Sequence, residues 1–278
     1  MVNTHLLYKY KYKFNRIDST EILYNSMILQ IANSFCEELK MTDVLVINGS
    51  ARTTKGNTAF VLSPFIQGMK NAGANVELLY SKKMDIRPCL GCFDCWGKTI
   101  GRCIITDEMQ DLYPKLKAAD ILVLATPIYI PLPGMMQNLI NRLCPLIEPL
   151  LEFKDGRTRA HFHNDVKISK ILTVITGGWW EIENLNIPLK VMEELALNSS
   201  CEFAGAILRP HAYVLKQENE LNNQVLSKLE DVGQQLINNG QIDPKDLEFV
   251  SQPLIDKDTY LDMLNQDYLD AKAKLTKS

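Results

Sequence analysis

The chain has 278 residues, of which 46% are hydrophobic, so it can build a complete core without disulfides or a structural metal. Its 30 basic and 33 acidic residues give a net charge of -3, which excludes a general attraction to nucleic acid or to an anionic membrane. It contains no apolar run of about 20 residues and no secretory signal pattern, so we expect a cytoplasmic protein without a membrane partner.

Residues 1–41 differ in composition from the rest of the chain. Four basic residues between Lys9 and Arg16 alternate with aromatic ones, and a helix-like apolar stretch follows. Four charges are few for a contact with RNA or a membrane, which favours a solvated extension. Met41 opens a stretch typical of a protein start, so we expect residues 1–41 to be a flexible N-terminal extension or a segment upstream of the native start.

From Asp43 onward, short apolar runs alternate with segments of helical period, the pattern of buried parallel strands and covering helices. Pro133 and Gly134 are expected to open the third helix. The runs predict strands at 43–48, 75–80, 120–126, 168–176 and 202–208, and helices at 57–72, 107–118, 134–150, 185–198 and 218–239. Five β–α repeats predict an α/β fold, a doubly wound three-layer sandwich with a five-stranded parallel sheet.

The domain predicted from this pattern spans residues 42–242. Residues 243–278 form a tail with a helix-compatible, charged end. We expect this helical tail to pack either on a partner subunit or on its own core, and we assign it no chemistry.

A loop of small residues, Gly49–Thr58, follows the first strand and leads into a helix. Free backbone N–H groups and the positive end of the helix dipole at such a junction suit a dianionic phosphate. The loop lacks the Gly-Lys-Ser/Thr ending of a nucleoside-triphosphate loop, and it does not match the Gly-x-Gly-x-x-Gly dinucleotide fingerprint. The phosphate of FMN therefore fits best, and a plain β–α turn is the alternative. The candidate phosphate-binding residues are Ser50, Arg52, Gly56, Asn57 and Thr58.

Two further loops are expected at the same edge of the sheet, where α/β proteins bind ligands. The loop after the third strand is stiffened by three prolines, and the one after the fourth contains two glycines followed by Trp179 and Trp180, indoles suited to stacking or to excluding solvent. The candidate residues for the ribityl chain and flavin ring are Thr126, Pro127, Ile128, Tyr129, Gly177 and Gly178.

Four cysteines cluster after the second strand: Cys89, Cys92, Cys95 and, after seven residues, Cys103. Thiols spaced by three residues wrap around one centre, which favours an iron-sulfur cluster over zinc, while thiols without metal are the third alternative. Each of the remaining cysteines, Cys36, Cys144 and Cys201, stands alone among apolar neighbours and is expected to be a buried small hydrophobe.

The phosphate loop, the Pro127–Tyr129 loop and the cysteine motif together resemble the NAD(P)H-dependent FMN reductase-like branch of the flavodoxin superfamily, and within it the iron-sulfur flavoproteins. The resemblance covers about Asp43 to Gly240. It implies strand order 2-1-3-4-5, FMN at the three loops, a 4Fe-4S cluster on the four clustered cysteines, and a homodimer or homotetramer. The chain departs from the common pattern by one extra residue between Arg52 and Gly56 and by the long gap before Cys103.

The function this implies is an FMN-dependent NAD(P)H oxidoreductase. It would pass electrons from nicotinamide through the flavin, and through the cluster if one is present, to a small-molecule or protein acceptor. No catalytic side chain is assigned, and His161 and His163 are expected to be solvated. The alternatives are a flavodoxin-type electron carrier without enzymatic activity and a cysteine-based metal or redox sensor.

Overall fold

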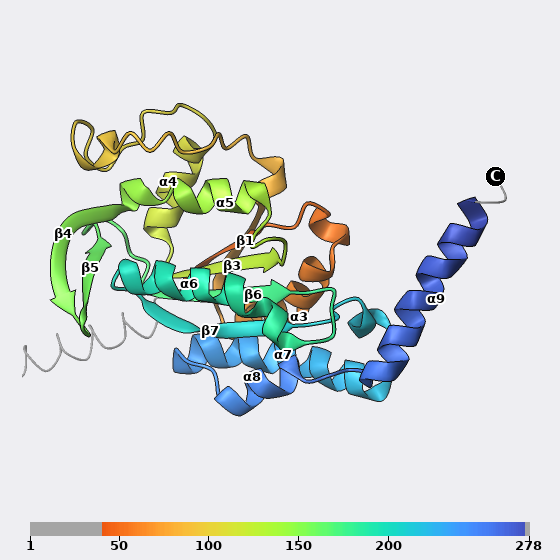
Figure 1. Cartoon of the computed structure of the whole chain (residues 1–278). Coiled ribbons are helices and arrows are strands. Elements are labelled where there is room, and N and C mark those ends of the chain that lie inside the picture. Colours follow the sequence, from red (N-terminus) through yellow and green to blue (C-terminus); the bar gives the residue numbers. More distant parts are fainter. Residues whose placement is uncertain (1–40, 276–278) are drawn as a thin grey trace, which may run out of the picture. The chain divides into compact units, whose positions relative to one another are not determined.

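The computed structural model describes residues 41–275, drawn in colour in Figure 1. Residues 1–40 lie outside this part, so the N-terminal extension stays a prediction. Within residues 41–275, no helix combines the length and apolar character needed to cross a bilayer.

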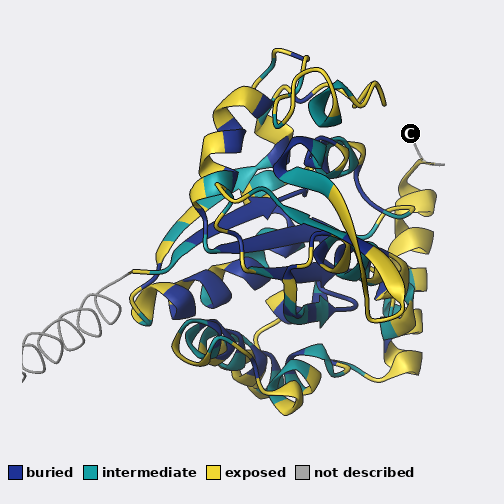
Figure 2. Cartoon of the chain, turned by 90° about the vertical axis from the view of Figure 1, so that its left-hand side faces the viewer, coloured by how far each residue is buried: buried dark blue, intermediate teal, exposed yellow. Residues whose placement is uncertain are grey.

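Five parallel strands form the central sheet, in the order β2-β1-β3-β6-β7. This order confirms the predicted α/β fold and its 2-1-3-4-5 arrangement. The strands are β1 (Asp43–Asn48), β2 (Asn75–Tyr80), β3 (Ile121–Pro127), β6 (Lys170–Thr176) and β7 (Glu202–Arg209). The three inner strands are buried along almost their whole length, as Figure 2 shows, because helices cover both faces of the sheet.

Two helical layers sandwich the sheet (Figure 1). Along β1, Val44 and Val46 pack on one side, whereas Leu45 and Ile47 pack on the other. The first side is covered by α3 (Asn57–Asn71), α7 (Glu220–Asn239), α8 (Pro244–Ser251) and the beginning of α9 (Lys257–Leu275). The second side is covered by α4 (Met109–Ala118), α5 (Gly134–Asn141) and α6 (Asn186–Asn198).

The predicted helix at 134–150 is wrong beyond Asn141. A 3-10 turn, η4 (Cys144–Leu146), follows α5, and the chain then forms an antiparallel hairpin of β4 (Ile147–Lys154) and β5 (Arg157–Phe162). The hairpin turn is Asp155-Gly156, with φ of 52° and 75°, and Asp-Gly is a typical sequence for such a turn. This dipeptide was the signal that could have predicted the hairpin.

Helices α3 and α7 approach closely because each presents a glycine to the other. A Cβ on Gly68 would lie 1.9 Å from the carbonyl oxygen of Glu230, and one on Gly233 would lie 2.1 Å from that of Phe65. Backbone atoms cannot move aside as a flexible side chain can, so both positions require glycine.

We predict that Gly233→Ala lowers the free energy of unfolding by about 2 kcal/mol or more, because the new methyl group must push α3 and α7 apart. Alanine is the better helix former, so a net loss isolates the backbone clash. Gly134→Ala is the matched control, since its Cβ would meet no atom within 4 Å. Urea unfolding of both variants measures the difference, and equal stabilities would contradict the prediction.

Candidate functional site

Three loops meet at the carboxyl ends of the neighbouring strands β1, β3 and β6. The Gly49 amide donates to the Ala125 carbonyl at 2.7 Å, which joins the first loop to the second. The Ile128 amide donates to the Thr176 carbonyl at 2.8 Å, which joins the second loop to the third. The sheet order therefore brings together the three segments that the sequence nominates for a flavin.

The phosphate loop is held in shape by its own side chains. Ser50 donates its amide to Asn48 Oδ1 at 2.8 Å, and its hydroxyl oxygen accepts from the Arg52 amide at 3.3 Å. The extra residue noted in the sequence falls in a 3-10 turn, η1 (Thr53–Lys55). A Cβ on Gly56 would lie 2.6 Å from Ser50 Oγ, so a larger residue would displace the Ser50 hydroxyl where the loop closes.

The phosphate loop offers the donors that an anion requires. Gly56 precedes α3, and no side chain caps this end of the helix, so its first amides are available. Asn48 Nδ2 is buried at the base of the loop with no hydrogen-bond partner among residues 41–275. Arg52 is exposed, and Asn57 is the half-buried first residue of α3. These features fit a dianionic phosphate.

Thr58 occupies a different place from the other candidate phosphate ligands. Its side chain is buried, and Oγ1 lies 2.7 Å from Thr176 Oγ1. The pair ties the start of α3 to the end of β6, so Thr58 positions the loop against its neighbour.

A cavity of about 450 Å³ lies between the second and third loops. Four predicted residues line it: Ile128, Tyr129, Gly177 and Gly178. Further lining residues, which the sequence did not single out, include Ile130, Pro131, Asn184, Leu185 and Ile187. The walls are mainly apolar with exposed backbone, as suits a flat heteroaromatic ring.

Thr126 and Pro127 do not line this cavity. Thr126 is fully buried in the sheet and donates its hydroxyl to the Pro127 carbonyl at 2.9 Å. Both residues shape the turn rather than the cavity wall.

Gly177 lies close to the side chain of Leu185. A Cβ at this position would lie 2.8 Å from Leu185 Cδ2. Of the two indoles, Trp179 lines the cavity and is largely exposed, whereas Trp180 turns away and donates Nε1 to the Ile255 carbonyl at 2.9 Å.

The C-terminal tail braces the third loop, a role that the sequence did not suggest. Tyr260 is 3% exposed and donates its hydroxyl to the Gly178 carbonyl. Fully buried His211 accepts from the Leu254 amide at Nε2, 3.0 Å away, and its Nδ1 lies 3.2 Å from the Trp180 carbonyl. The accepting Nε2 requires the proton on Nδ1, so the contacts fix the imidazole tautomer. Gly178 is thereby attached to the tail.

Arg209 fixes the tail at the end of α8. Its fully buried guanidinium donates to three consecutive carbonyls at the end of α8, those of Val250, Ser251 and Gln252. Burial lowers the pKa of Arg209 to about 9, which leaves it charged at neutral pH, where it complements the negative end of the helix dipole. These contacts explain why the tail packs on its own core.

The four motif cysteines converge on one cavity of about 70 Å³, together with a fifth thiol. The fifth is Cys144, so its prediction as an isolated buried hydrophobe is wrong: it is half-buried and lines this cavity, because η4 turns back toward the motif. Cys201 is buried as predicted, and Cys36 lies outside the described residues. Among residues 41–275 no three side chains are already arranged to hold a metal ion, although the donors are those that iron or zinc uses.

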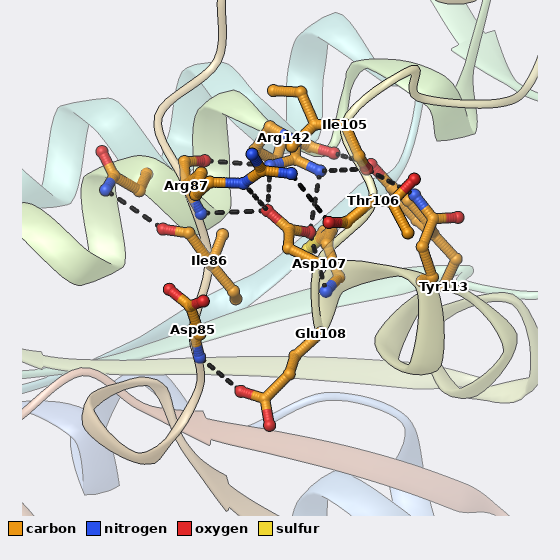
Figure 3. Close-up of polar contacts among 12 residues, drawn as sticks. Asp85, Ile86, Arg87, Ile105, Thr106, Asp107, Glu108, Tyr113 and Arg142 are labelled. Atoms are coloured by element: carbon orange, nitrogen blue, oxygen red, sulfur yellow. Dashed lines mark hydrogen bonds and ion pairs between the residues drawn. The ribbon is translucent and has the colours of Figure 1, made fainter.

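A buried ion pair anchors both ends of the cysteine segment (Figure 3). Arg142 donates to Asp107 at 2.7 and 3.1 Å, to the Arg87 carbonyl at 2.9 Å and to the Ile105 carbonyl at 3.4 Å. Both charged side chains are 1% exposed. Burial acts to raise the pKa of the Asp107 carboxyl, but hydrogen bonds from Arg142 and two backbone amides outweigh it and hold that pKa below its usual range.

Comparison with known proteins supports the expected likeness. Residues 42–164 match the family described as NADPH-dependent FMN reductase. An iron-sulfur flavoprotein of Archaeoglobus fulgidus is 34% identical over 100 residues, which are 36% of this chain and 47% of the relative. One of Methanocaldococcus jannaschii is 30% identical over 104 residues, 37% of this chain and 52% of the relative. The predicted resemblance is therefore confirmed, and the match spans about half the length of these relatives.

Solved structures share the fold. A putative quinone reductase from Klebsiella pneumoniae aligns with a TM-score of 0.54 and 14% identity, over 73% of this chain and 86% of that one. An azoreductase from Bacillus anthracis aligns with a TM-score of 0.52 and 13% identity, over 72% and 100%. At such identities the likeness concerns the fold alone.

The buried His211 predicts a pH dependence of stability. Burial, followed by the charge of Arg209, lowers the pKa of His211 from its ordinary 6.5 to about 4. Between pH 4 and 6.5, His211 is therefore protonated in the unfolded chain but neutral in the folded chain. The contribution of His211 to the free energy of unfolding is fully present above pH 6.5. It falls by about 3 kcal/mol as the pH drops from 6.5 through 4, since a tenfold difference in proton affinity is worth about 1.4 kcal/mol.

Urea unfolding of the wild type and of His211→Gln between pH 4 and 8 measures this contribution. Glutamine can still accept from the Leu254 amide but does not titrate, so the difference between the two curves removes the effect of the carboxylates. Parallel curves for the two proteins would contradict the assignment.

Proposed function

We propose that this chain is an FMN-dependent oxidoreductase that takes electrons from NADH or NADPH. The observation that carries the proposal is the placement of a glycine-closed, uncapped phosphate loop next to a ring-sized apolar cavity, at the carboxyl ends of adjacent strands. The match of residues 42–164 to NADPH-dependent FMN reductases supports the same cofactor and donor.

Each part of the crevice has a separate task toward FMN. Ser50, Asn57 and the first amides of α3 would bind the phosphate, while Arg52 would offset its charge. Ile128 and Tyr129 would flank the ring, and Gly177 and Gly178 would bring backbone against its edge. FMN, when bound, supplies the hydride-accepting and electron-transferring chemistry. The protein would orient the ring and shield one side of it.

The clustered cysteines would hold an iron-sulfur cluster, which would make the protein a link between two-electron and one-electron transfer. The thiol content of the cavity fits such a cluster, and relatives named iron-sulfur flavoproteins support it. Free thiols and such a cluster persist in the reducing cytoplasm, which supports a cytoplasmic location.

A second copy of the chain would complete the crevice. The rim of the cavity exposes Tyr129, Ile130, Trp179 and Ile187, which are between 54% and 102% accessible. Apolar groups gathered at the mouth of a cavity fit a partner subunit, so we propose a homodimer or a homotetramer, with room left for the nicotinamide and for a small-molecule or protein acceptor.

Loss of the glycine closure tests the phosphate site. We expect Gly56→Ala to raise the Kd for FMN about tenfold or more, because the methyl group displaces Ser50 Oγ at a cost of about 1–3 kcal/mol. Quenching of FMN fluorescence on titration with metal-free protein measures Kd, and Gly134→Ala serves as the control. Equal affinities for FMN in the two variants would exclude this loop as the phosphate site.

Reduction by nicotinamide tests the activity. Under anaerobic conditions we expect NADH or NADPH to bleach the visible absorption of protein-bound FMN far faster than that of free FMN, because the crevice holds both reactants in place. Loss of colour over time, at equal concentrations of bound and free FMN, gives the two rates. A protein that binds FMN but is bleached by neither nucleotide would instead be an electron carrier.

A further inference from the structure

The cysteine cavity contains one thiol more than a metal centre of its kind uses. It lies between the cysteine segment and η4, and five thiols form part of its wall: Cys89, Cys92, Cys95, Cys103 and Cys144. A cuboidal cluster or a tetrahedral zinc ion binds four thiolates. The fifth thiol comes from a separate element of the fold.

Cys144 is held in place by contacts on both sides. The indole of Trp96, which lies within the cysteine segment, donates to the Cys144 carbonyl at 2.8 Å. Two residues before Cys144, the buried Arg142 bonds to the chain on each side of the segment, at the Arg87 and Ile105 carbonyls. These contacts fix the backbone around Cys144, whose thiol lines the same cavity as the motif thiols.

A buried cation faces the same cavity. Arg142 lines it, and its Nε has no hydrogen-bond partner among the described residues. Four thiolates around a divalent metal, or around a cuboidal cluster, leave a net negative charge. The charge of Arg142 is already paired with Asp107, so what Arg142 offers such a centre is its unpartnered Nε–H, a hydrogen-bond donor toward a thiolate.

We propose that Cys144 is an alternative fourth ligand of this thiophilic metal site and takes the place of Cys103 when Cys103 does not bind. Cys89, Cys92 and Cys95 belong to one tight loop, whereas Cys103 and Cys144 each approach from outside it. Either can complete a set of four. The proposal rests on the metal-binding part of the proposed function and is independent of the flavin.

Cobalt(II) added to the metal-free protein under anaerobic conditions tests this, because the intensity of thiolate-to-cobalt charge transfer reports the number of bound thiolates. We expect Cys103→Ser to keep the four-thiolate intensity of the wild type. Cys103→Ser combined with Cys144→Ser should lose about a quarter of the intensity, as one of four ligands is removed, and should bind cobalt at least tenfold more weakly.

Two results would overturn the proposal. One is that Cys103→Ser alone loses about a quarter of the charge-transfer intensity and that Cys144→Ser causes no further loss. The other is that the wild type binds no cobalt through thiolates. Cys201→Ser is the control, since Cys201 is buried away from the cavity. Circular dichroism identifies any serine variant that fails to fold. Such a variant is then replaced by the alanine substitution at the same cysteine.

Iron and acid-labile sulfide analysis of the same wild-type sample separates the two proposals. If the protein binds cobalt through four thiolates and the variants behave as expected, but it contains no iron and sulfide, the five-thiol site is supported. The iron-sulfur cluster of the proposed function is then contradicted.

Discussion

Burial of the inner strands on both faces is the constraint on which the rest of this structure depends. β1, β3 and β6 are parallel and lie under helices on each side, so every connection between them must cross over a face of the sheet. Their carboxyl ends consequently open at one edge. The phosphate loop, the proline-rich loop and the glycine loop meet there because the sheet leaves them no other place.

The second organising interaction is the buried pair of Arg142 and Asp107. A buried charge pair offers little net stability, but removal of either partner leaves an uncompensated charge, so such a pair enforces one arrangement. Here it joins the two ends of the cysteine segment to the end of α5. The segment has few helical residues of its own, and this pair gives it a defined path around the cavity.

The tail plays a comparable supporting role at the proposed flavin crevice. Arg209 holds the end of α8, His211 holds Leu254, and Tyr260 reaches the Gly178 carbonyl. A segment without a reactive group thus sets the position of a loop that would touch the flavin edge. Such supporting contacts matter in a cofactor site because small displacements of first contacts are costly.

The amino-acid sequence by itself determined the strand positions and the nominated loops, and the sheet order followed from its resemblance to a known family. Periodicity and glycine placement are local properties, and parallel strands buried on both faces leave a strong apolar signal. The tertiary structure alone decided that Cys144 joins the motif thiols, that Thr58 faces Thr176, and that the tail braces Gly178. These contacts join residues 41 to 118 positions apart, and no local pattern encodes which distant side chains the packing of helices on a sheet will bring together.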